Sequence, residues 1–276
     1  MVRFREYILK GISFICSLSA TVMLFTQVNT NAYAGNDMYI YNATLNPAQQ
    51  MVYNQVYENI IAFNEGIFRL NTPLSHADLY VTMNALYNDH PELFWVNTSY
   101  KYGFNSHNLV VQLKLNYCIK KSSFASATLA FNQAIDNIVN QAVAYPTELE
   151  RERIVHDMIC DLSTYNSINS SHQSAYSALV EGNSVCAGYS RAFQIACQRL
   201  GITCYYVTGI ANGEEHAWNI VKIGGNYYNV DVTGDDTINE TLNTHSYQYF
   251  NVSDNDIAHN HTRSDLSAML PVCNSF

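Results

Sequence analysis

The spacing of apolar residues changes at Gly201, and this change constrains the fold of the second half of the chain most strongly. Apolar side chains recur at helical spacing over residues 186–200, and glycine commonly follows the end of a helix. Three later runs alternate between apolar and polar residues, as β-strands do: residues 204–209, 217–223 and 227–232. Gly224-Gly225 is a typical tight turn between the last two runs. The pattern predicts a helix followed by antiparallel strands, with a further strand over residues 246–250.

The region before this segment is predicted to be mainly helical, with one β-hairpin. Apolar residues recur at helical spacing in three stretches: residues 46–70, Ser75 to just before Pro91, and residues 124–143. Two alternating runs flank a short polar turn and predict the hairpin: Thr98–Phe104 and Leu109–Tyr117.

A capping box predicts the start of the next helix at Thr147. In this motif the threonine side chain accepts a hydrogen bond from a backbone N–H, while Glu150, three residues later, reaches back. A polar loop over residues 166–174 and a short helix ending at Gly182 then lead to the segment described above. Helices and an antiparallel sheet in separate stretches predict an α+β fold, with a domain boundary between residues 145 and 146.

The first 34 residues have the layout of a secretory signal peptide. Three basic residues precede an apolar run over residues 11–25, and Ala32-Tyr33-Ala34 matches an A-x-A cleavage site. A membrane anchor is the alternative, but the run is short for a membrane span and no second run follows. We therefore expect an exported protein (secreted, periplasmic or on the cell surface) whose signal peptide is residues 1–34 and whose mature chain begins near Gly35.

The charge of the expected mature chain is strongly negative. The full chain has 14 Lys and Arg against 23 Asp and Glu, a net charge of −9. The signal peptide contains three of the basic residues and one of the acidic ones, so 11 basic and 22 acidic residues remain, a net charge of −11. A chain this acidic repels phosphate-rich partners, so we expect no nucleic-acid or anionic-lipid partner. Because no second apolar run follows residues 11–25, we also expect no stable membrane span after cleavage.

Six cysteines remain after cleavage, none in a CxxC motif: Cys118, Cys160, Cys186, Cys197, Cys204 and Cys273. Cys197 and Cys204 fall where the predicted helix turns back into a strand, which would suit a disulfide. Buried free thiols explain the same spacing, so the pairing stays open.

Four residues near the C-terminus have metal-ligand chemistry: Asp254, Asp256, His259 and His261. Their spacing suits no standard zinc site, and Asp235-Asp236 lacks the pattern of a calcium loop. The sequence therefore predicts no metal and no other cofactor.

Cys186 falls at the predicted N-terminus of its helix, where unpaired N–H groups favour a thiolate. A cysteine nucleophile also needs a base, typically an imidazole that a carboxylate or amide holds in place. His216 begins one predicted strand, and Asp231 follows the next. Because the intervening turn makes these strands antiparallel, we expect both residues at the same end of the sheet. The three residues indicate a Cys-His-Asp triad.

The segment from His156 to Thr233 resembles the transglutaminase-like superfamily. The matching blocks are Ser184-Val185-Cys186-Ala187-Gly188-Tyr189-Ser190, Gly201-Ile202, Val207-Thr208-Gly209, His216-Ala217-Trp218 and Tyr228-Asn229-Val230-Asp231-Val232-Thr233. Further upstream, Asp89-His90-Pro91-Glu92-Leu93-Phe94-Trp95 resembles a motif of bacterial exported members. One departure is Gly234, since family members often have an aromatic residue shortly after the aspartate motif.

The resemblance implies a papain- and transglutaminase-like catalytic domain over residues 146–276, in which a cysteine-bearing helix packs on an antiparallel sheet. It implies that Cys186 is the nucleophile, His216 the base and Asp231 the residue that orients the base. It also makes Tyr165 a candidate donor to the oxyanion, beside the backbone N–H of Cys186.

The N-terminal region, residues 35–145, is too apolar to be a disordered tail. We expect it to pack against the catalytic half and to form one side of the substrate cleft, with Phe94 and Trp95 among the contacts. An independent adhesion or targeting domain is the alternative. The candidate cleft-lining residues are Trp218, Tyr189 and Trp95.

The expected activity is attack on a protein or peptide amide, with a thioester intermediate that passes to an amine or to water. The residues leave open which of these outcomes, transglutaminase-like transfer or hydrolysis, occurs. The alternative function is a catalytically inactive surface binding module on the same fold. Such relics usually lose the cysteine or the histidine first, and this chain retains both.

Overall fold

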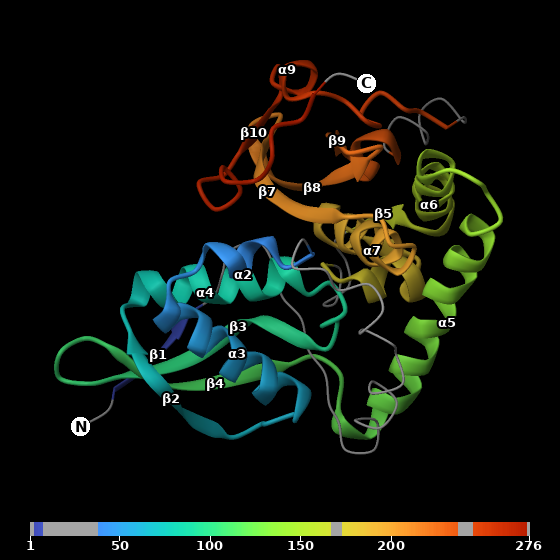
Figure 1. The fold of residues 1–276 in the computed structure, drawn as a ribbon. Coiled ribbons are helices and arrows are strands. Elements are labelled where there is room, and N and C mark those ends of the chain that lie inside the picture. Colours follow the sequence, from blue (N-terminus) through green and yellow to red (C-terminus); the bar gives the residue numbers. More distant parts are fainter. Residues whose placement is uncertain (1–2, 8–37, 167–172, 237–244, 275–276) are drawn as a thin grey trace. The chain divides into compact units, whose positions relative to one another are not determined.

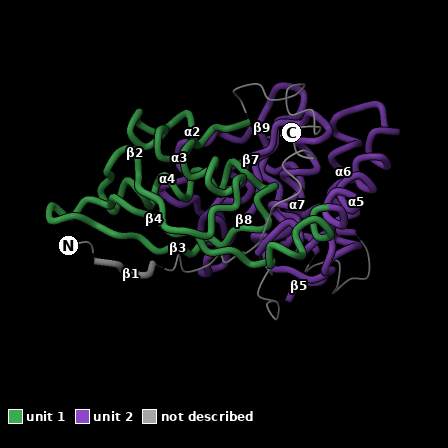
Figure 2. Tube along the Cα trace, turned by 90° about the horizontal axis from the view of Figure 1, so that it is seen from below, with its two compact units in different colours: residues 1–128 green, residues 129–276 purple. Residues whose placement is uncertain are grey.

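The computed structural model describes four stretches of the chain: residues 3–7, 38–166, 173–236 and 245–274. They form two compact units, residues 1–128 and residues 129–276 (Figure 2). The units divide inside helix α5 (Phe124–Ala142), upstream of the boundary that the sequence predicts at residues 145 and 146. Both units combine helices with a mainly antiparallel sheet, so the α+β class is confirmed.

The first unit contains a four-stranded antiparallel sheet with the strand order β1-β3-β4-β2 (Figure 1). Its strands are β1 (Arg3–Tyr7), β2 (Ile67–Leu74), β3 (Val96–Phe104) and β4 (Val110–Tyr117). Its other helices are α2 (Ile40–Thr44), α3 (Pro47–Ile61) and α4 (His76–Asp89), and a 3₁₀ turn, η3 (Lys121–Ser123), precedes α5. Helices α3 and α4 pack against each other and against β2.

The helix predicted over residues 46–70 is wrong beyond Ile61. Asn46 and Pro47 start α3 as expected, because the Asn46 side chain accepts a hydrogen bond from the N–H of Gln49 at 3.0 Å. The chain then leaves the helix at Phe63, whose φ of 56° lies in the left-handed region. Residues 67–74 are strand β2 instead, since a short apolar run does not distinguish a helix from a strand by spacing alone. The hairpin and the helices α4 and α5 are confirmed.

The Asp89–Trp95 motif holds the first unit together. Asp89 accepts hydrogen bonds from the Asn42 N–H at 2.8 Å and the Tyr53 hydroxyl at 3.0 Å, and burial raises the pKa of its carboxyl to about 6. Trp95 is fully buried, and its ring lies 5.1 Å from that of Phe124. Trp95 is therefore a core residue of this unit, which corrects its assignment to the lining of a cleft.

The second unit packs helix α7 (Cys186–Arg199) against a four-stranded antiparallel sheet with the order β10-β7-β8-β9 (Figure 1). The strands are β7 (Cys204–Ala211), β8 (Glu214–Ile223), β9 (Asn226–Val230) and β10 (His261–Arg263). Smaller elements are β5 (Thr164–Tyr165), the π-helical turn η4 (Ser177–Glu181), β6 (Asn183–Ser184) and α9 (Asp254–Ile257). Helix α6 (Glu148–Leu162) begins at the predicted capping box and packs against α7.

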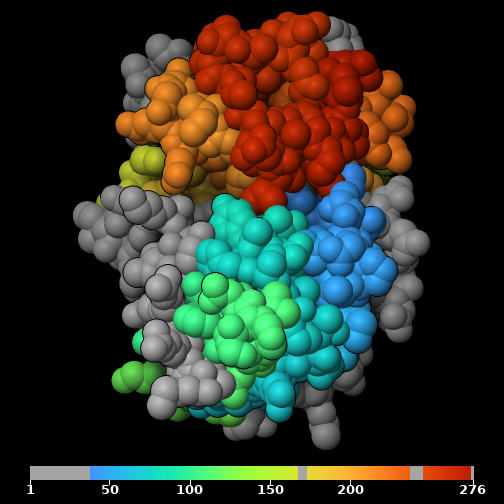
Figure 3. Space-filling model, turned by 90° about the vertical axis from the view of Figure 1, so that its left-hand side faces the viewer, coloured from blue at the N-terminus to red at the C-terminus, as the bar shows by residue number. Residues whose placement is uncertain are grey.

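The fourth strand is β10, not residues 246–250 as the sequence predicted. That segment is irregular because its backbone groups bind elsewhere: the Tyr249 N–H donates to the Asp235 side chain at 3.1 Å, and the Tyr249 carbonyl accepts from the Asp231 N–H at 3.0 Å. In the space-filling view the C-terminal residues (red) form a continuous surface beside the orange residues of the sheet (Figure 3). The C-terminal segment completes the sheet because β10 pairs with β7.

Cys197 and Cys204 are both buried, and burial together with the nearby Cys204 thiol raises the pKa of Cys197. Both are free thiols here, so the disulfide that the sequence left open is not formed in this structure. In the stretches that the structure covers, no helix is long and apolar enough to cross a membrane. The predicted signal peptide lies outside the described residues except for Arg3–Tyr7, which form β1.

Candidate active site

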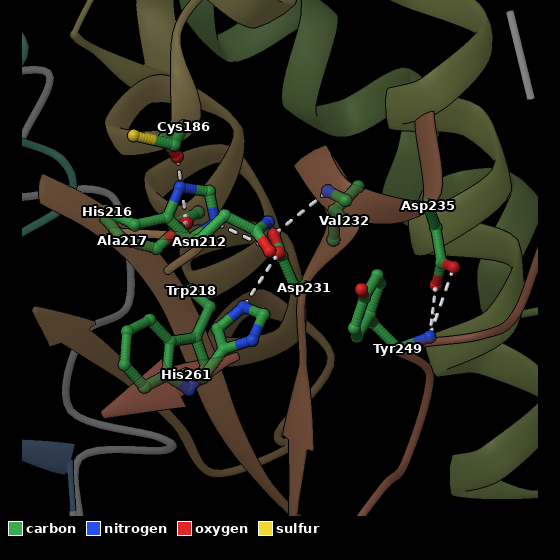
Figure 4. Close-up of polar contacts among 12 residues, drawn as sticks. Cys186, Asn212, His216, Ala217, Trp218, Asp231, Val232, Asp235, Tyr249 and His261 are labelled. Atoms are coloured by element: carbon green, nitrogen blue, oxygen red, sulfur yellow. Dashed lines mark hydrogen bonds and ion pairs between the residues drawn. The ribbon is translucent and has the colours of Figure 1, made fainter. Parts of the chain in front are cut away.

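Cys186 is the first residue of α7 and is half-buried (Figure 4). A buried serine one turn later fixes its position relative to the sheet. The Ser190 Oγ atom lies 2.8 Å from the carbonyl oxygen of Cys186 and 3.0 Å from that of Ala217 on β8. The Asn219 side chain, also on β8, donates to the Ser190 carbonyl at 3.0 Å. These bonds fasten the first turn of α7 beside His216.

His216 lies between the cysteine and the aspartate. Its Nε2 atom donates to the Asp231 Oδ2 atom at 2.9 Å, so Nδ1 is the nitrogen left to face the thiol. Burial lowers the pKa of His216, but the Asp231 charge and hydrogen bond, together with a hydrogen bond to Cys186, raise it to about 10. The Asp231 carboxylate therefore favours the protonated form of the imidazole. The sequence placed His216 and Asp231 at one end of the sheet, and the structure brings them into contact.

Asp231 is buried, and each of its side-chain oxygens has a partner. The Oδ1 atom accepts the Gly234 N–H at 3.1 Å and so caps the helical turn over residues 232–236. Burial raises the pKa of the Asp231 carboxyl, but the His216 charge and hydrogen bonds from both His216 and His261 outweigh it, so the pKa lies well below its usual range. Asp231 is thus a fixed anion.

The packing around Gly234 explains why this chain has no aromatic residue at this position after the aspartate. A Cβ atom at this position would lie 2.6 Å from the Asp231 Oδ2 atom and 2.8 Å from the Tyr249 ring. No side chain fits between the cap and the ring, so an aromatic residue here would displace the carboxylate.

A second imidazole, which the sequence marks only by its metal-ligand chemistry, binds the same carboxylate. His261 on β10 donates from Nε2 to the Asp231 Oδ2 atom at 3.2 Å, and its side chain is 2% exposed (Figure 4). Its ring packs edge-on against that of Trp218, with centroids 5.1 Å apart. No local pattern marks His261 for this role, because the role depends on β10 pairing with β7, which only the fold reveals.

A buried network behind Asp231 anchors the segment that follows it. His156 on α6 lies between two carboxylates, 3.0 Å from Asp157 and 3.3 Å from Asp235. Burial lowers the His156 pKa, but these two partners raise it to about 9. Asp235 in turn accepts the Tyr249 N–H, and the Tyr249 carbonyl binds the N–H of Asp231. The network links α6 to the backbone of Asp231.

Glu152 ties the same segment to α6, and its burial has a measurable effect on stability. It is fully buried and accepts a hydrogen bond from Asn251 at 2.8 Å, and burial raises its pKa to about 8. The folded chain keeps this proton at pH values where the unfolded chain loses it. Stability is therefore expected to fall as pH rises from the ordinary glutamate value to about 8.

Glu152→Gln, which mimics the protonated acid, is expected to melt at a higher temperature than wild type at about pH 9. At about pH 5 the two proteins should melt close together, because wild-type Glu152 then keeps its proton. Thermal melts followed by circular dichroism at both pH values measure this difference. Glu215→Gln, a change at an exposed position, serves as the control and should show no such pH dependence. A Glu152→Gln effect that is equal at both pH values contradicts the expectation.

The three aromatic candidates of the second unit take different positions. Tyr165 is half-exposed on β5, paired with Ser184, and its pKa is raised by burial and by the charges of Cys186 and Glu214. Trp218 is buried beneath the two histidines and donates to Asn229 at 3.0 Å, while the Tyr189 hydroxyl is buried and donates to Asp236 at 2.6 Å. Trp218 and Tyr189 therefore support the site from within the core, which corrects their assignment to the cleft lining. Tyr165 remains accessible beside the cysteine.

The acidic and histidine residues near the C-terminus do not gather into one cluster. Asp254 pairs with Arg263, Asp256 caps α9 through Ser253, and His259 binds a backbone carbonyl. His261 instead joins His216 and Asp231, and each of the three offers a ligand atom within 4.8 Å of the others. Within the described stretches these three have metal-ligand chemistry and spacing, but hydrogen bonds already pair their polar atoms.

Comparison with known proteins identifies the class of this region. Residues 136–232 match the family model for the transglutaminase-like superfamily (Transglut_core). The matched stretch contains Cys186, His216 and Asp231. The resemblance stated from the sequence is thereby confirmed for this part of the chain, together with the cysteine-bearing helix on an antiparallel sheet.

The solved structures that match this chain cover about half of it. A transglutaminase ("TGase") structure is 16% identical over 50% of this chain and 46% of its own, with a TM-score of 0.36. A Cytophaga hutchinsonii protein described as a "putative cysteine protease" is 21% identical over 50% of this chain and 45% of its own, with a TM-score of 0.34. The matched part therefore spans less than half of either protein. A search of curated proteins found no match.

Proposed function

We propose that the chain is an exported cysteine enzyme that attacks protein or peptide amides through Cys186. The observation that carries this proposal is the arrangement at the start of α7: Cys186 begins the helix, Ser190 bonds this turn to β8, and His216 on β8 binds the buried Asp231 carboxylate at 2.9 Å. A half-buried cysteine at a helix N-terminus, with an imidazole on the neighbouring strand to move protons, suits nucleophilic catalysis. The match to the transglutaminase-like superfamily supports the same chemistry.

The first half-reaction forms a thioester. The Cys186 sulfur bonds to the amide carbonyl carbon, and the negative charge moves onto the carbonyl oxygen, where the Cys186 N–H and the Tyr165 hydroxyl would stabilise it. As the carbon–nitrogen bond breaks, His216 passes its proton from Nδ1 to the departing amine. Asp231 holds the imidazole in place throughout. The amine leaves, and the acyl group remains on sulfur.

The second half-reaction has two outcomes. A water molecule or a primary amine attacks the thioester carbonyl carbon, and the neutral His216 takes a proton from it. The carbon–sulfur bond then breaks, and the Cys186 sulfur leaves as the group that began the cycle. Water gives an acid, whereas an amine such as a lysine side chain gives a new amide. The triad chemistry serves both outcomes, so the acceptor that the site admits decides between hydrolase and transferase.

Mass spectrometry of a glutamine-rich protein, incubated with the full chain and a primary amine, tests the proposal. A mass gain on glutamine supports transglutaminase activity, conversion of glutamine to glutamate supports a deamidase, and new chain termini support a peptidase. The same incubation with Cys186→Ala is the control. If wild type produces none of the three changes and its Cys186 reacts with iodoacetamide no faster than an ordinary thiol, the enzyme proposal is overturned in favour of a binding module.

Export rests on the layout of the first 34 residues. A chain cleaved after Ala34 would lack β1, and β3 would then be an edge strand in the first unit. N-terminal sequencing of the protein recovered outside the cytoplasm should give a start near Gly35. A start at Met1 would contradict cleavage.

A further inference from the structure

Asp231 interacts with two histidines through one oxygen atom. The Oδ2 atom lies 2.9 Å from His216 Nε2 and 3.2 Å from His261 Nε2, and Oδ1 accepts the Gly234 N–H at 3.1 Å. A carboxylate oxygen accepts in two directions, so one imidazole occupies each. These three donors fix the plane of the carboxylate.

The sheet brings the second imidazole to this oxygen across β7. His261 pairs with Ala211, and two residues away on the same face of β7 Gly209 pairs with His216. Ala211 and Gly209 are small, so the two imidazoles approach each other edge to face, with ring centroids 5.6 Å apart. No residue larger than glycine fits at position 209, because a Cβ there would lie 2.6 Å from the Trp218 ring.

Neighbouring side chains hold the His261 ring in this orientation. The Asn260 Oδ1 atom lies 2.6 Å from His261 Nδ1, and Asn260 is itself held by a hydrogen bond to the Tyr249 hydroxyl at 2.9 Å. The Tyr249 and Trp218 rings pack against the imidazole, with centroids at 5.4 and 5.1 Å. The ring thus has fixed partners at both nitrogens.

We infer that His261 is a positioning residue of the catalytic site: its Nε2–H holds the Asp231 carboxylate, which in turn holds His216 against Cys186. The role presupposes the cysteine chemistry proposed above. Without this donor, one lone pair of a buried carboxylate loses its partner. Asp231 can then rotate or admit water, and the His216 imidazole loses its fixed orientation. Displacements of this kind cost up to about 10²-fold in rate.

Three substitutions separate the donor from the packing. His261→Gln places an amide N–H close to the position of the imidazole Nε2 and keeps the bond to Asp231. His261→Asn has similar polarity, but its shorter amide corresponds to Nδ1 and does not reach Asp231. His261→Phe keeps an aromatic ring against Trp218 and has no donor.

The measurement is the rate at which iodoacetamide alkylates Cys186 near neutral pH, followed by mass spectrometry of its peptide, with thermal melts to show that each variant is folded. His261→Gln is expected to stay within about threefold of wild type, whereas His261→Asn and His261→Phe slow alkylation by roughly 10- to 100-fold. If the role of His261 were purely structural, the alkylation rate would follow the melting temperature of each variant and not the presence of the donor.

Two results would overturn the inference. The first concerns the alkylation rate of folded variants: His261→Phe or His261→Asn reacts at the wild-type rate, or His261→Gln reacts as slowly as those two are expected to. The second is a wild-type rate that falls with EDTA and returns with zinc, which would make His216, Asp231 and His261 a metal site. Failure of the proposed function is distinguishable, because Cys186 would then react slowly in wild type as well.

Discussion

Cys186→Ala is expected to fold as wild type does and to lose turnover of amide substrates by roughly 10⁶-fold, to background. The reason is that the sulfur atom forms the covalent bond of the intermediate, and no other described cysteine takes its place. Cys160, Cys197, Cys204 and Cys273 are buried. The alanine itself is well tolerated, since Cys186 is half-buried at the first position of α7 and alanine favours a helix.

Product analysis by mass spectrometry, together with a thermal melt, checks this expectation. Cys118→Ala is the matched control, because Cys118 is also half-buried but lies in the first unit. It should retain wild-type turnover. A folded Cys186→Ala variant that still turns over substrate would exclude covalent catalysis at this residue.

Asp231→Asn is expected to lower kcat by roughly 10⁴-fold, by analogy with the loss of the carboxylate from other catalytic triads. The amide cannot satisfy the three donors around it. If its oxygen faces His216 and His261, its NH₂ group faces the Gly234 N–H, and the opposite orientation places the NH₂ group against both imidazoles. One conflict remains in either case, so the imidazole of His216 is no longer held against Cys186.

The same substitution should change the pH dependence. The Asp231 charge is the main cause that raises the His216 pKa to about 10 against the opposing effect of burial, and asparagine removes it. In the folded Asp231→Asn variant, His216 should therefore lose its proton at a lower pH than in wild type. The residual activity should accordingly decline at a lower pH on the alkaline side of its profile.

Rates measured across the pH range, with melting temperatures, test both effects. Asp161→Asn removes an aspartate whose side chain is 67% exposed and pairs with His245, so it is the control and should behave as wild type does. If Asp231→Asn matched wild type in rate and pH profile, Asp231 would be a capping residue only and another group would have to orient His216.

Local features of the sequence predicted most of the helices correctly, because each helix carries its own start and stop signals. Thr147 and Glu150 form the capping box that begins α6, and Ser75 caps α4. The helix that ends at Ile61 and the strand β2 were merged into one prediction, since the strand depends on pairing with β4 and not on a local signal.

The residues of the candidate site also divide into those that local sequence features predict and those that only the tertiary structure assigns. The order of Cys186, His216 and Asp231 along a helix and two strands joined by a tight turn predicts their proximity from the chain alone, because the hairpin fixes the register of β8 and β9. Trp218, Tyr189 and Trp95 were assigned to a cleft because aromatic residues suit both a core and a pocket, and only their burial distinguishes the two.

The sequence by itself thus determined the nucleophilic helix, the hairpin that carries the base and the carboxylate, and the superfamily to which this region is similar. All of these rest on contacts between residues close in the chain or joined by a short turn. Only the tertiary structure decided that His261, thirty positions beyond Asp231, binds the same oxygen atom as His216. That contact requires β10 to pair with β7 and two small residues to stand between the imidazoles. Such long-range pairing is set by the packing of the whole unit and leaves no mark on the neighbouring residues.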